Sequence, residues 1–221
     1  EPYRRQRSDV YKRQVVEKAK AVLHVWFPGT EGGNAIADVL FGDQEPGGRL
    51  AMCFPYTVGQ VPVYYSELHT GRRRPEGEIT PRGVSGYLDA PNHPLYAFGY
   101  GLTYTSFAYS EVSLSSEIMT REENLTAKIM VQNTGNRAGT EVVQLYIRDV
   151  AGSVARPVRE LKGFQRIAMQ PGESREVTFE ITEEMLRFYN IDMEYVAEPG
   201  RFEVYIGGSS DAEQKAEFRL V

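Results

Sequence analysis

The half of the chain that begins at Phe107 alternates apolar and polar residues over short runs, and this pattern most constrains the fold. The run 125–131, LTAKIMV, is apolar at every second position, and Val143, Leu145 and Ile147 repeat the pattern. Successive side chains of a β-strand point to opposite faces, so each run predicts a strand with one buried face. Further runs with this period lie at 112–114, 177–181, 202–206 and 216–220.

Turn signals separate these runs: Asn133-Thr-Gly-Asn136, Pro171-Gly172 and Pro199-Gly200. Roughly seven short strands with a turn about every ten residues indicate a β-sandwich of the immunoglobulin or fibronectin type. The one cysteine, Cys53, lies outside this region, which favours the fibronectin type over a disulfide-linked immunoglobulin domain. A single cysteine allows no internal disulfide and leaves the compartment open.

The residues that precede the sandwich follow an α/β pattern. Residues 15–20 are interpreted as the end of a helix. The run 21–27, AVLHVWF, is almost continuously apolar and predicts a buried parallel strand, which Pro28-Gly29 ends. Leu50–Phe54 predicts a second short strand, ended by Pro55.

A short helix is predicted between these strands. Thr30 is the expected N-cap, and Glu31 would lie in the first turn, where a carboxylate interacts favourably with the helix dipole. The residues Ile36, Val39 and Leu40 have helical spacing and predict one buried stripe. Gly42 stands where a glycine commonly ends a helix.

The glycine-rich turn 28–33, PGTEGG, does not match a phosphate-binding loop. A Walker loop needs Lys-Ser/Thr after its glycines, and a dinucleotide-binding loop needs G-x-G-x-x-G; this turn has neither. The glycines are interpreted as allowing close packing or as facing a pocket.

A long polar segment, residues 67–95, connects the α/β region to the aromatic run 95–107, LYAFGYGLTYTSF. Long loops in compact domains are usually functional or disordered. The loop contains His69 and His93, yet no spacing of ligands predicts a metal site. Its arginines 72–74 are interpreted as a solvated face rather than an anion site. The run 95–107 is predicted to be a packed seam between two domains.

Charge and hydropathy argue against nucleic acid as the main partner and against a membrane-spanning helix. The formal net charge is −5, which argues against nucleic acid, and no stretch of about 18 apolar residues predicts a membrane span. The segment 1–14, EPYRRQRSDVYKRQ, contains basic residues without an apolar period. It is interpreted as a disordered or foreign tail rather than an anion-binding arm, and it is not followed by the apolar region of a signal peptide.

Four motifs, in order and with matching spacing, resemble glycoside hydrolase family 3, closest to the periplasmic β-glucosidases with a fibronectin III-like domain. They are WFPGTEGGNAIADVLFGDQEPGGRLAMCFP, VGQVPVYYSELHTGR, YAFGYGLTYTSF and RPVRELKGFQRIAMQPGE. The resemblance covers 15–221. It implies that 15–106 is the C-terminal portion of an α/β sandwich domain and that 107–221 is a fibronectin III-like β-sandwich. The family's N-terminal barrel has no counterpart in this chain.

The resemblance implies a retaining, exo-acting β-glucosidase that removes terminal β-D-glucosyl residues. Such enzymes need two carboxyl groups about 5–5.5 Å apart. In the family the nucleophile comes from the barrel, and the acid/base comes from upstream of the W-x-P-G-x-E-G-G motif. No catalytic residue is therefore expected here, and the chain alone is expected to be inactive. Glu31 is a poor substitute, because a general acid must hold its proton whereas a helix N-terminus favours the ionised carboxylate.

The residues expected to border a sugar pocket combine aromatic and polar side chains, as sugar recognition requires. They are Trp26, Glu31, His69, Arg82, Tyr87 and Asp89. For each one, a surface or packing role is the competing interpretation.

No cofactor and no metal is expected. Through the whole enzyme the partners would be β-linked glucosides or oligosaccharides, and a homodimer stays open. The resemblance implies a periplasmic or secreted location. The competing hypothesis is a non-catalytic carbohydrate-binding or scaffolding module, which an exposed row of aromatic residues on the β-domain would support.

Overall fold

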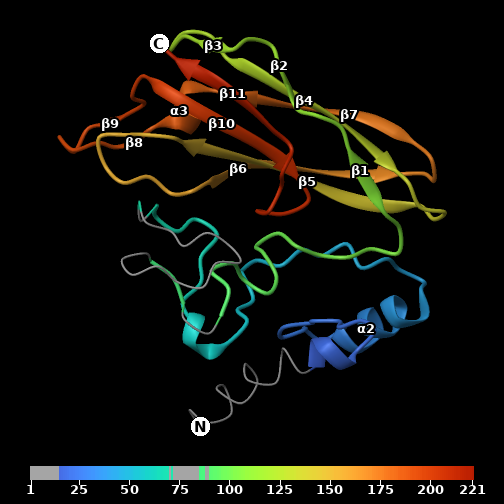
Figure 1. The fold of residues 1–221 in the computed structure, drawn as a ribbon. Coiled ribbons are helices and arrows are strands. Elements are labelled where there is room, and N and C mark those ends of the chain that lie inside the picture. Colours follow the sequence, from blue (N-terminus) through green and yellow to red (C-terminus); the bar gives the residue numbers. More distant parts are fainter. Residues whose placement is uncertain (1–14, 70, 72–84, 88–89) are drawn as a thin grey trace.

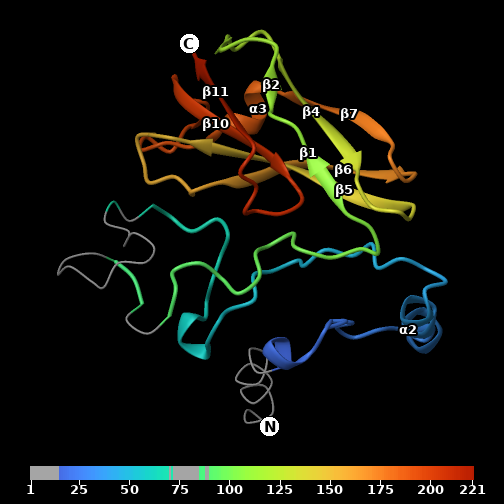
Figure 2. The same cartoon turned by 45° about the vertical axis from the view of Figure 1, so that its right-hand side comes forward.

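A computed structural model describes residues 15–69, 71, 85–87 and 90–221 of the chain. Figure 1 shows two layers: a β-sandwich formed by the residues from 107 onward, and beneath it a layer of irregular segments with the helix α2 (Gly32–Phe41). The view in Figure 2 shows the same two layers after a 45° turn. The predicted arrangement, a partial α/β unit followed by an all-β sandwich, matches this division.

The first sheet of the sandwich is built around one long strand. The strand β4 (Leu125–Asn133) pairs antiparallel with β7 (Ser174–Ile181) along eight residue pairs. On β4's other edge, β1 (Phe107–Tyr109) and β2 (Ser113–Leu114) pair antiparallel in succession. These four strands form the 4-stranded sheet.

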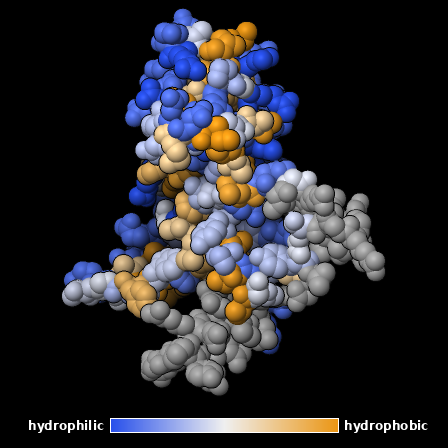
Figure 3. Space-filling model, turned by 90° about the vertical axis from the view of Figure 1, so that its left-hand side faces the viewer, coloured by the Kyte–Doolittle hydropathy of each residue, from blue (hydrophilic) through white to orange (hydrophobic). Residues whose placement is uncertain are grey.

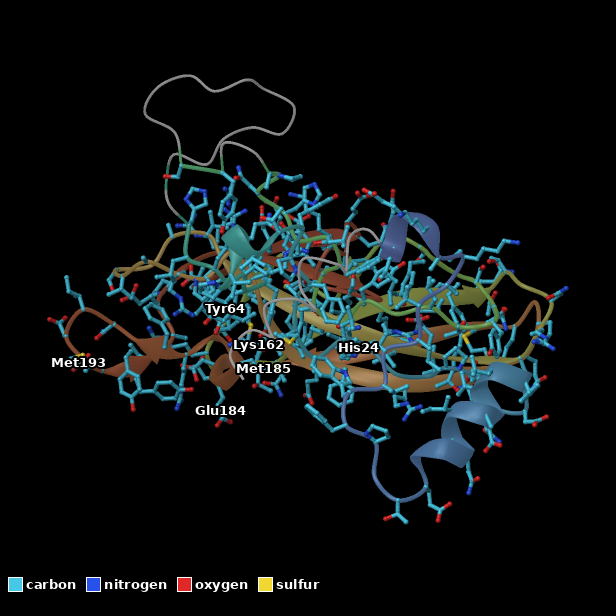
Figure 4. The ribbon with its side chains drawn as sticks, turned by 90° about the horizontal axis from the view of Figure 1, so that it is seen from below. His24, Tyr64, Lys162, Glu184, Met185 and Met193 are labelled. Carbon is cyan, nitrogen blue, oxygen red and sulfur yellow. The ribbon has the colours of Figure 1, made fainter. Side chains whose placement is uncertain are left out.

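The second sheet has five strands in the order β3-β11-β10-β5-β6. Their bounds are β3 (Ile118–Met119), β11 (Lys215–Leu220), β10 (Gly200–Gly207), β5 (Gly139–Asp149) and β6 (Glu160–Met169). The pair β11–β3 is parallel and the other pairs are antiparallel. A short helix, α3 (Glu183–Leu186), and a hairpin of β8 (Phe188–Tyr189) and β9 (Tyr195–Val196) follow β7. Figure 4 shows Met193 at the outer tip of this hairpin.

The core lies between the two sheets and follows the alternation of the sequence. On β4 every second side chain from Leu125 to Val131 is buried, and Val143, Leu145 and Ile147 on β5 are buried as predicted. The strands predicted at 177–181, 202–206 and 216–220 are present. The predicted β-sandwich is therefore confirmed.

The strand β5 is buried on both faces, which the alternation alone does not predict. Gln144 and Tyr146 point away from the sandwich core, yet both are buried. The Gln144 Nε2 donates to the Gly99 oxygen at 3.2 Å, and Tyr65 packs edge-on against Tyr146 at 5.9 Å. The described residues that precede the sandwich, 15–106, are called the lower layer from here on. This layer covers the outer face of the second sheet, and residues of the predicted seam 95–107 lie in the contact.

A charged cluster lies around Glu203 on β10. Its carboxylate accepts a bond from the Tyr205 hydroxyl at 2.7 Å, and it is 3.1 Å from Arg148 Nη1 and 3.4 Å from Lys215 Nζ. Burial raises the pKa of Glu203, but the Tyr205 hydrogen bond and the two cations outweigh it and lower the pKa from its ordinary value of 4.5.

The buried strand predicted at 21–27 is wrong. Residues 15–18 are helical, but 21–27 form no strand, and Val22, Trp26 and Phe27 are exposed. A parallel strand of this kind needs neighbours on both edges and cover on both faces, and no other described segment pairs with 21–27. The apolar character of the run indicates a buried strand, but its partners are not among the described residues.

The run Leu50–Phe54 is extended but forms no ladder of its own. Its backbone bonds to the returning seam: Leu50 N donates to the Tyr100 oxygen at 2.9 Å, and Phe54 N donates to the Tyr96 oxygen at 2.8 Å. The bridge Phe54–Tyr96 is antiparallel. The predicted strand is thus reduced to a single bridge. A one-turn helix, η1 (Val58–Gln60), follows it.

The helix α2 differs from its prediction at its start and on its apolar side. Glu31, not Thr30, occupies the N-cap position, and no side chain caps the helix. Ile36 and Val39 are half-buried, but Leu40 is 66% exposed, so the stripe is not covered within the described residues. Gly42 ends the helix in the left-handed conformation, at φ 85°, as predicted.

Within the described residues, no helix has the length and apolar character that a membrane crossing requires.

Candidate functional site

A pocket of about 290 Å³ lies where the 67–95 loop leaves and rejoins the body of the protein. Two of the residues predicted to border a sugar pocket, His69 and Tyr87, line it together. Its other lining residues are Glu67, Leu68, Ser85, Gly86, Asn92 and Val158. The pocket therefore combines a phenol, an imidazole, an amide and a carboxylate with apolar carbon, the mixture that suits a polyhydroxylated ligand.

The buried side chain of Gln60 organises the returning end of the loop. Its Nε2 donates to the Pro91 oxygen at 2.6 Å and its Oε1 accepts from Tyr56 N at 2.5 Å. The Tyr87 hydroxyl donates to the backbone oxygen of Gln60 at 3.2 Å, and Tyr87 N donates to Asn92 Oδ1 at 3.1 Å. The amide partners fix the Gln60 side chain between Tyr56 and Pro91. The Gln60 backbone oxygen, together with Asn92, holds Tyr87. Nothing local in the sequence marks Gln60, because only Tyr56 is a near neighbour and its contacts with Pro91 and Tyr87 span 31 and 27 positions.

The outgoing end of the loop is held by the β-sandwich. Val158 N donates to the Glu67 oxygen at 2.9 Å, and Leu68 forms an antiparallel bridge with Pro157. His69 follows directly, and its Nδ1 accepts a bond from Gly71 N at 3.0 Å. One wall of the pocket, Val158, therefore comes from the fibronectin-like half of the chain.

The other predicted residues do not line this pocket. Trp26 is half-exposed in the left-handed region at φ 51° and packs with His24 and Phe54, with centroids 4.4 and 6.2 Å away. Figure 4 labels His24 on the lower side of the molecule. Glu31, at the start of α2, accepts a bond from Asn34 Nδ2 at 2.7 Å. Figures 1 and 2 place α2 and the described ends of the loop at opposite ends of the lower layer. Arg82 and Asp89 lie outside the described residues.

A second hollow, of about 460 Å³, lies where the end of α2 meets the sandwich. None of the residues predicted to border a sugar pocket that the structure describes lines this hollow, and its walls include Glu45, Tyr104 and Arg137. The Arg137 guanidinium lies over the Tyr104 ring, 5.6 Å from its centroid. Within the described part of the chain, no three His, Cys, Asp or Glu side chains come together to hold a metal ion.

A buried ion pair joins the two layers. Arg49 Nη2 lies 3.1 Å from Glu141 Oε2, and the side chains are only 8% and 7% exposed. The Tyr109 hydroxyl is buried beside this pair, and burial, followed by the charge of Glu141, raises its pKa. Because both charges are removed from water, losing either side chain would leave the other buried without a counter-charge and would destabilise the contact between the layers. The two residues are 92 positions apart, so sequence reasoning missed them.

Two family models match the chain in succession. The glycosyl hydrolase family 3 C-terminal domain matches residues 6–104, and a fibronectin type III-like domain matches residues 141–210. The first match begins inside the segment 1–14, so the interpretation of that segment as a foreign tail stays a prediction.

Proteins and solved structures with β-glucosidase names resemble nearly the whole chain. A periplasmic beta-glucosidase of Salmonella typhimurium is 52% identical over 93% of this chain and 27% of its own length. A putative beta-xylosidase of Formosa agariphila is 41% identical over 93% of this chain and 26% of its own. The crystal structure of a beta-glucosidase from Listeria innocua with glucose superposes with a TM-score of 0.87, at 44% identity, over 95% of this chain and 29% of its own. The chain thus spans about a quarter of the length of these relatives, 26–27% for the two sequences.

Proposed function

Because the chain belongs to glycoside hydrolase family 3, we propose that it is the C-terminal part of a retaining, exo-acting β-glucosidase that removes terminal β-D-glucosyl residues. The observation that carries the proposal is the succession of both family domains in one chain, at 52% identity to a protein named periplasmic beta-glucosidase. Relatives named as beta-xylosidases support a test with both sugars.

The described residues support a role at the border of the substrate pocket rather than in the bond-breaking step. A retaining mechanism needs a nucleophile and an acid/base about 5–5.5 Å apart, and the family resemblance assigns both to segments upstream of residue 26. His69 and Tyr87, held by the loop ends, would contact hydroxyl groups of the substrate. Trp26 and Glu31 do not line this pocket, so they are left out of its proposed border. Arg82 and Asp89 lie outside the described residues and stay predicted border residues from the middle of the loop.

Hydrolysis of an aryl β-D-glucoside and of an aryl β-D-xyloside tests the proposal with three proteins. They are the complete gene product, the 221-residue chain and the complete product with Glu31→Gln. The complete product should hydrolyse the glucoside faster than the xyloside. The 221-residue chain should melt cooperatively but show no turnover, and Glu31→Gln should reduce kcat by less than about tenfold, since general acid–base catalysis contributes about 10²–10⁴-fold.

Two results would overturn parts of this proposal. Turnover by the 221-residue chain would mean that a catalytic carboxylate lies within it, and Glu31 would be the first residue to replace. A complete product that hydrolyses neither glycoside would remove the assignment as a glycosidase of these two sugars.

One observation favours the second candidate, a non-catalytic carbohydrate-binding module. On the β8–β9 hairpin, Tyr189 is 62% and Tyr195 is 50% exposed, with ring centroids 5.2 Å apart. Exposed aromatic rings can stack on sugars. Figure 3 faces the side of the molecule on which this hairpin lies. Binding of β-glucan by the 221-residue chain, lost when both tyrosines become alanine, would support the module; equal retention by the variant would exclude it.

The cellular location and the assembly are also proposals. The relative from Salmonella typhimurium is named periplasmic, which supports a periplasmic or secreted location. Cell fractionation of the source organism tests the location. Size-exclusion chromatography with light scattering on the complete product tests a homodimer.

A further inference from the structure

The connection between β5 and β6 contains the motif Arg156-Pro157-Val158-Arg159, here called the RPVR segment. It belongs to one of the motifs that carry the family resemblance, yet the proposed chemistry gives it no task. The segment is the part of the fibronectin-like half that meets the 67–95 loop. Its two arginines are both anchored, in different ways, on either side of Pro157-Val158.

The first anchor is Arg156. Its Nη2 donates to Glu160 Oε2 at 2.9 Å, and its Nε lies 3.4 Å from Asp149 Oδ2. The guanidinium also lies over the Phe188 ring, 4.0 Å from the centroid. Arginine can satisfy a carboxylate and an aromatic face together because its fork is planar. Arg156 thus connects the segment to β5, β6 and β8.

The second anchor is Arg159. Its Nη1 donates to the backbone oxygen of Ser210 and, at 3.1 Å, to that of Ala212. Its guanidinium lies over the Tyr205 ring at 4.0 Å. Burial lowers the pKa of Arg159. This side chain ties the segment to β10 and to the turn after it, and Ser210 N in turn donates to the Phe98 oxygen of the seam at 2.9 Å.

Between the two anchors, the backbone of Pro157-Val158 is presented to the loop. Val158 N donates to the Glu67 oxygen, and Leu68 bridges Pro157. Further along, Leu161 N lies 3.4 Å from the Tyr65 hydroxyl, and the Tyr65 ring stacks on Phe98 at 4.4 Å. The outgoing end of the loop is therefore fixed to the fibronectin-like half by the backbone bond between Val158 and Glu67 and by the Tyr65 hydroxyl, which accepts from Leu161 N.

We propose that the fibronectin-like half positions the substrate pocket: the RPVR segment fixes residues 67–69, and the Val158 side chain forms a wall that selects the substrate. This inference rests on the proposed function, because it assumes that the pocket lined by His69 and Tyr87 receives the glycoside. Val158 determines specificity by shape, and the two arginines are positioning residues. None of the three takes part in bond breaking.

The specificity half is tested in the complete gene product with Val158→Phe and the matched control Val154→Phe. Val154 lies in the same connection but does not line the pocket. A changed hydrophobic wall alters substrate discrimination by about tenfold or more. Val158→Phe should therefore raise KM for the aryl β-glucoside about tenfold with kcat nearly unchanged. The conservative variant Val158→Ile should keep a KM close to that of the wild type. The control Val154→Phe should match the wild type in both constants.

The positioning half is tested by hydrogen exchange on the 221-residue chain, which requires no activity. Arg159→Ala should speed exchange of the Val158 and Leu161 amides, which donate to the Glu67 oxygen and the Tyr65 hydroxyl, at least about tenfold, while the central β4 amides stay protected. The control Arg175→Ala removes an arginine from an exposed ion pair with Glu173 and should change neither.

The outcomes distinguish a failure of the specificity role from a failure of the proposed function. If the complete product hydrolyses glucoside but Val158→Phe and Val158→Ala both keep the wild-type KM, the specificity role is wrong while the proposed function stands. If no glycoside is hydrolysed, the proposed function fails and the specificity role with it. The exchange experiment still decides positioning: unchanged exchange of the Val158 and Leu161 amides in Arg159→Ala would overturn it.

Discussion

Replacing Arg49 by methionine should weaken the attachment of the lower layer to the sandwich more than any surface substitution. The variant leaves the Glu141 carboxylate buried without its cation, at a site where the two side chains are 8% and 7% exposed. Breaking one partner of a buried pair costs about 3–5 kcal/mol. The cost falls on the docking of the layers, because Glu141 becomes hydrated as soon as the layers separate.

The chain contains one tryptophan, Trp26, and this allows the two layers to be followed separately. Trp26 packs with His24 and Phe54 in the lower layer, so its fluorescence reports that layer, whereas far-UV circular dichroism reports mainly the sandwich. In Arg49→Met the fluorescence transition should move to lower urea. On heating, a loss of about 3 kcal/mol corresponds to about 6–12 °C. The dichroism transition should move less, since the sandwich keeps its core.

Two further variants make the reasoning refutable. Lys128→Met breaks an exposed pair, 47% and 50% exposed and 2.9 Å apart, and should cost no more than about 1 kcal/mol. The double variant Arg49→Met with Glu141→Leu leaves no buried charge and should be more stable than Arg49→Met alone. If Arg49→Met costs as little as Lys128→Met, the buried pair does not hold the layers. Equal shifts of both transitions would show that the two layers unfold as one unit.

The pKa of Glu203 is lowered in the folded protein, so its ionised form stabilises the fold above pH 4.5 and this contribution is lost as the pH falls through the lowered value. Urea titrations should therefore find Glu203→Gln less stable than the wild type at pH 7, with the difference shrinking below pH 4.5; a difference independent of pH would contradict this. Gly99→Ala should lower the melting temperature more than Gly172→Ala. Both glycines have positive φ, 79° and 76°, but only at Gly99 would a Cβ overlap a neighbour, the buried Gln144 side-chain amide, whereas at Gly172 it would meet open space. Equal shifts would show that the interface can yield. Native-state hydrogen exchange should find 15–66 less protected than 107–221, because its apolar surface is largely uncovered; comparable protection would refute that.

The sandwich could be predicted strand by strand because its signal is local. A strand with one face in a core repeats apolar residues with period two; β4 follows this period along its whole length, and β7 follows it from Val177 onward. The left-handed Gly42 was predictable for the same reason, since a helix end is decided within a few residues. The strand predicted at 21–27 failed because a buried parallel strand depends on neighbours that no local pattern supplies.

The candidate site was predicted only in part. The sequence identified His69 and Tyr87 by residue type and by their place in a long loop, and the fold brings both to one pocket. It did not identify Gln60, which holds Tyr87, or Val158, which forms a wall from the other half of the chain. Amides and valines are common in any sequence, so their type carries no signal without their contacts.

The sequence by itself determined the two-part organisation, the strands of the sandwich and the family resemblance, because periodicity, turn residues and motif order are properties of neighbouring positions. Only the tertiary structure decided that Arg49 meets Glu141, that Val158 meets Glu67, and that β5 is buried on both faces. These contacts join residues about ninety positions apart, as the separations of 92 for Arg49–Glu141 and 96 for Tyr65–Leu161 show. They depend on which two surfaces pack together, and surface complementarity exists only once both halves have folded.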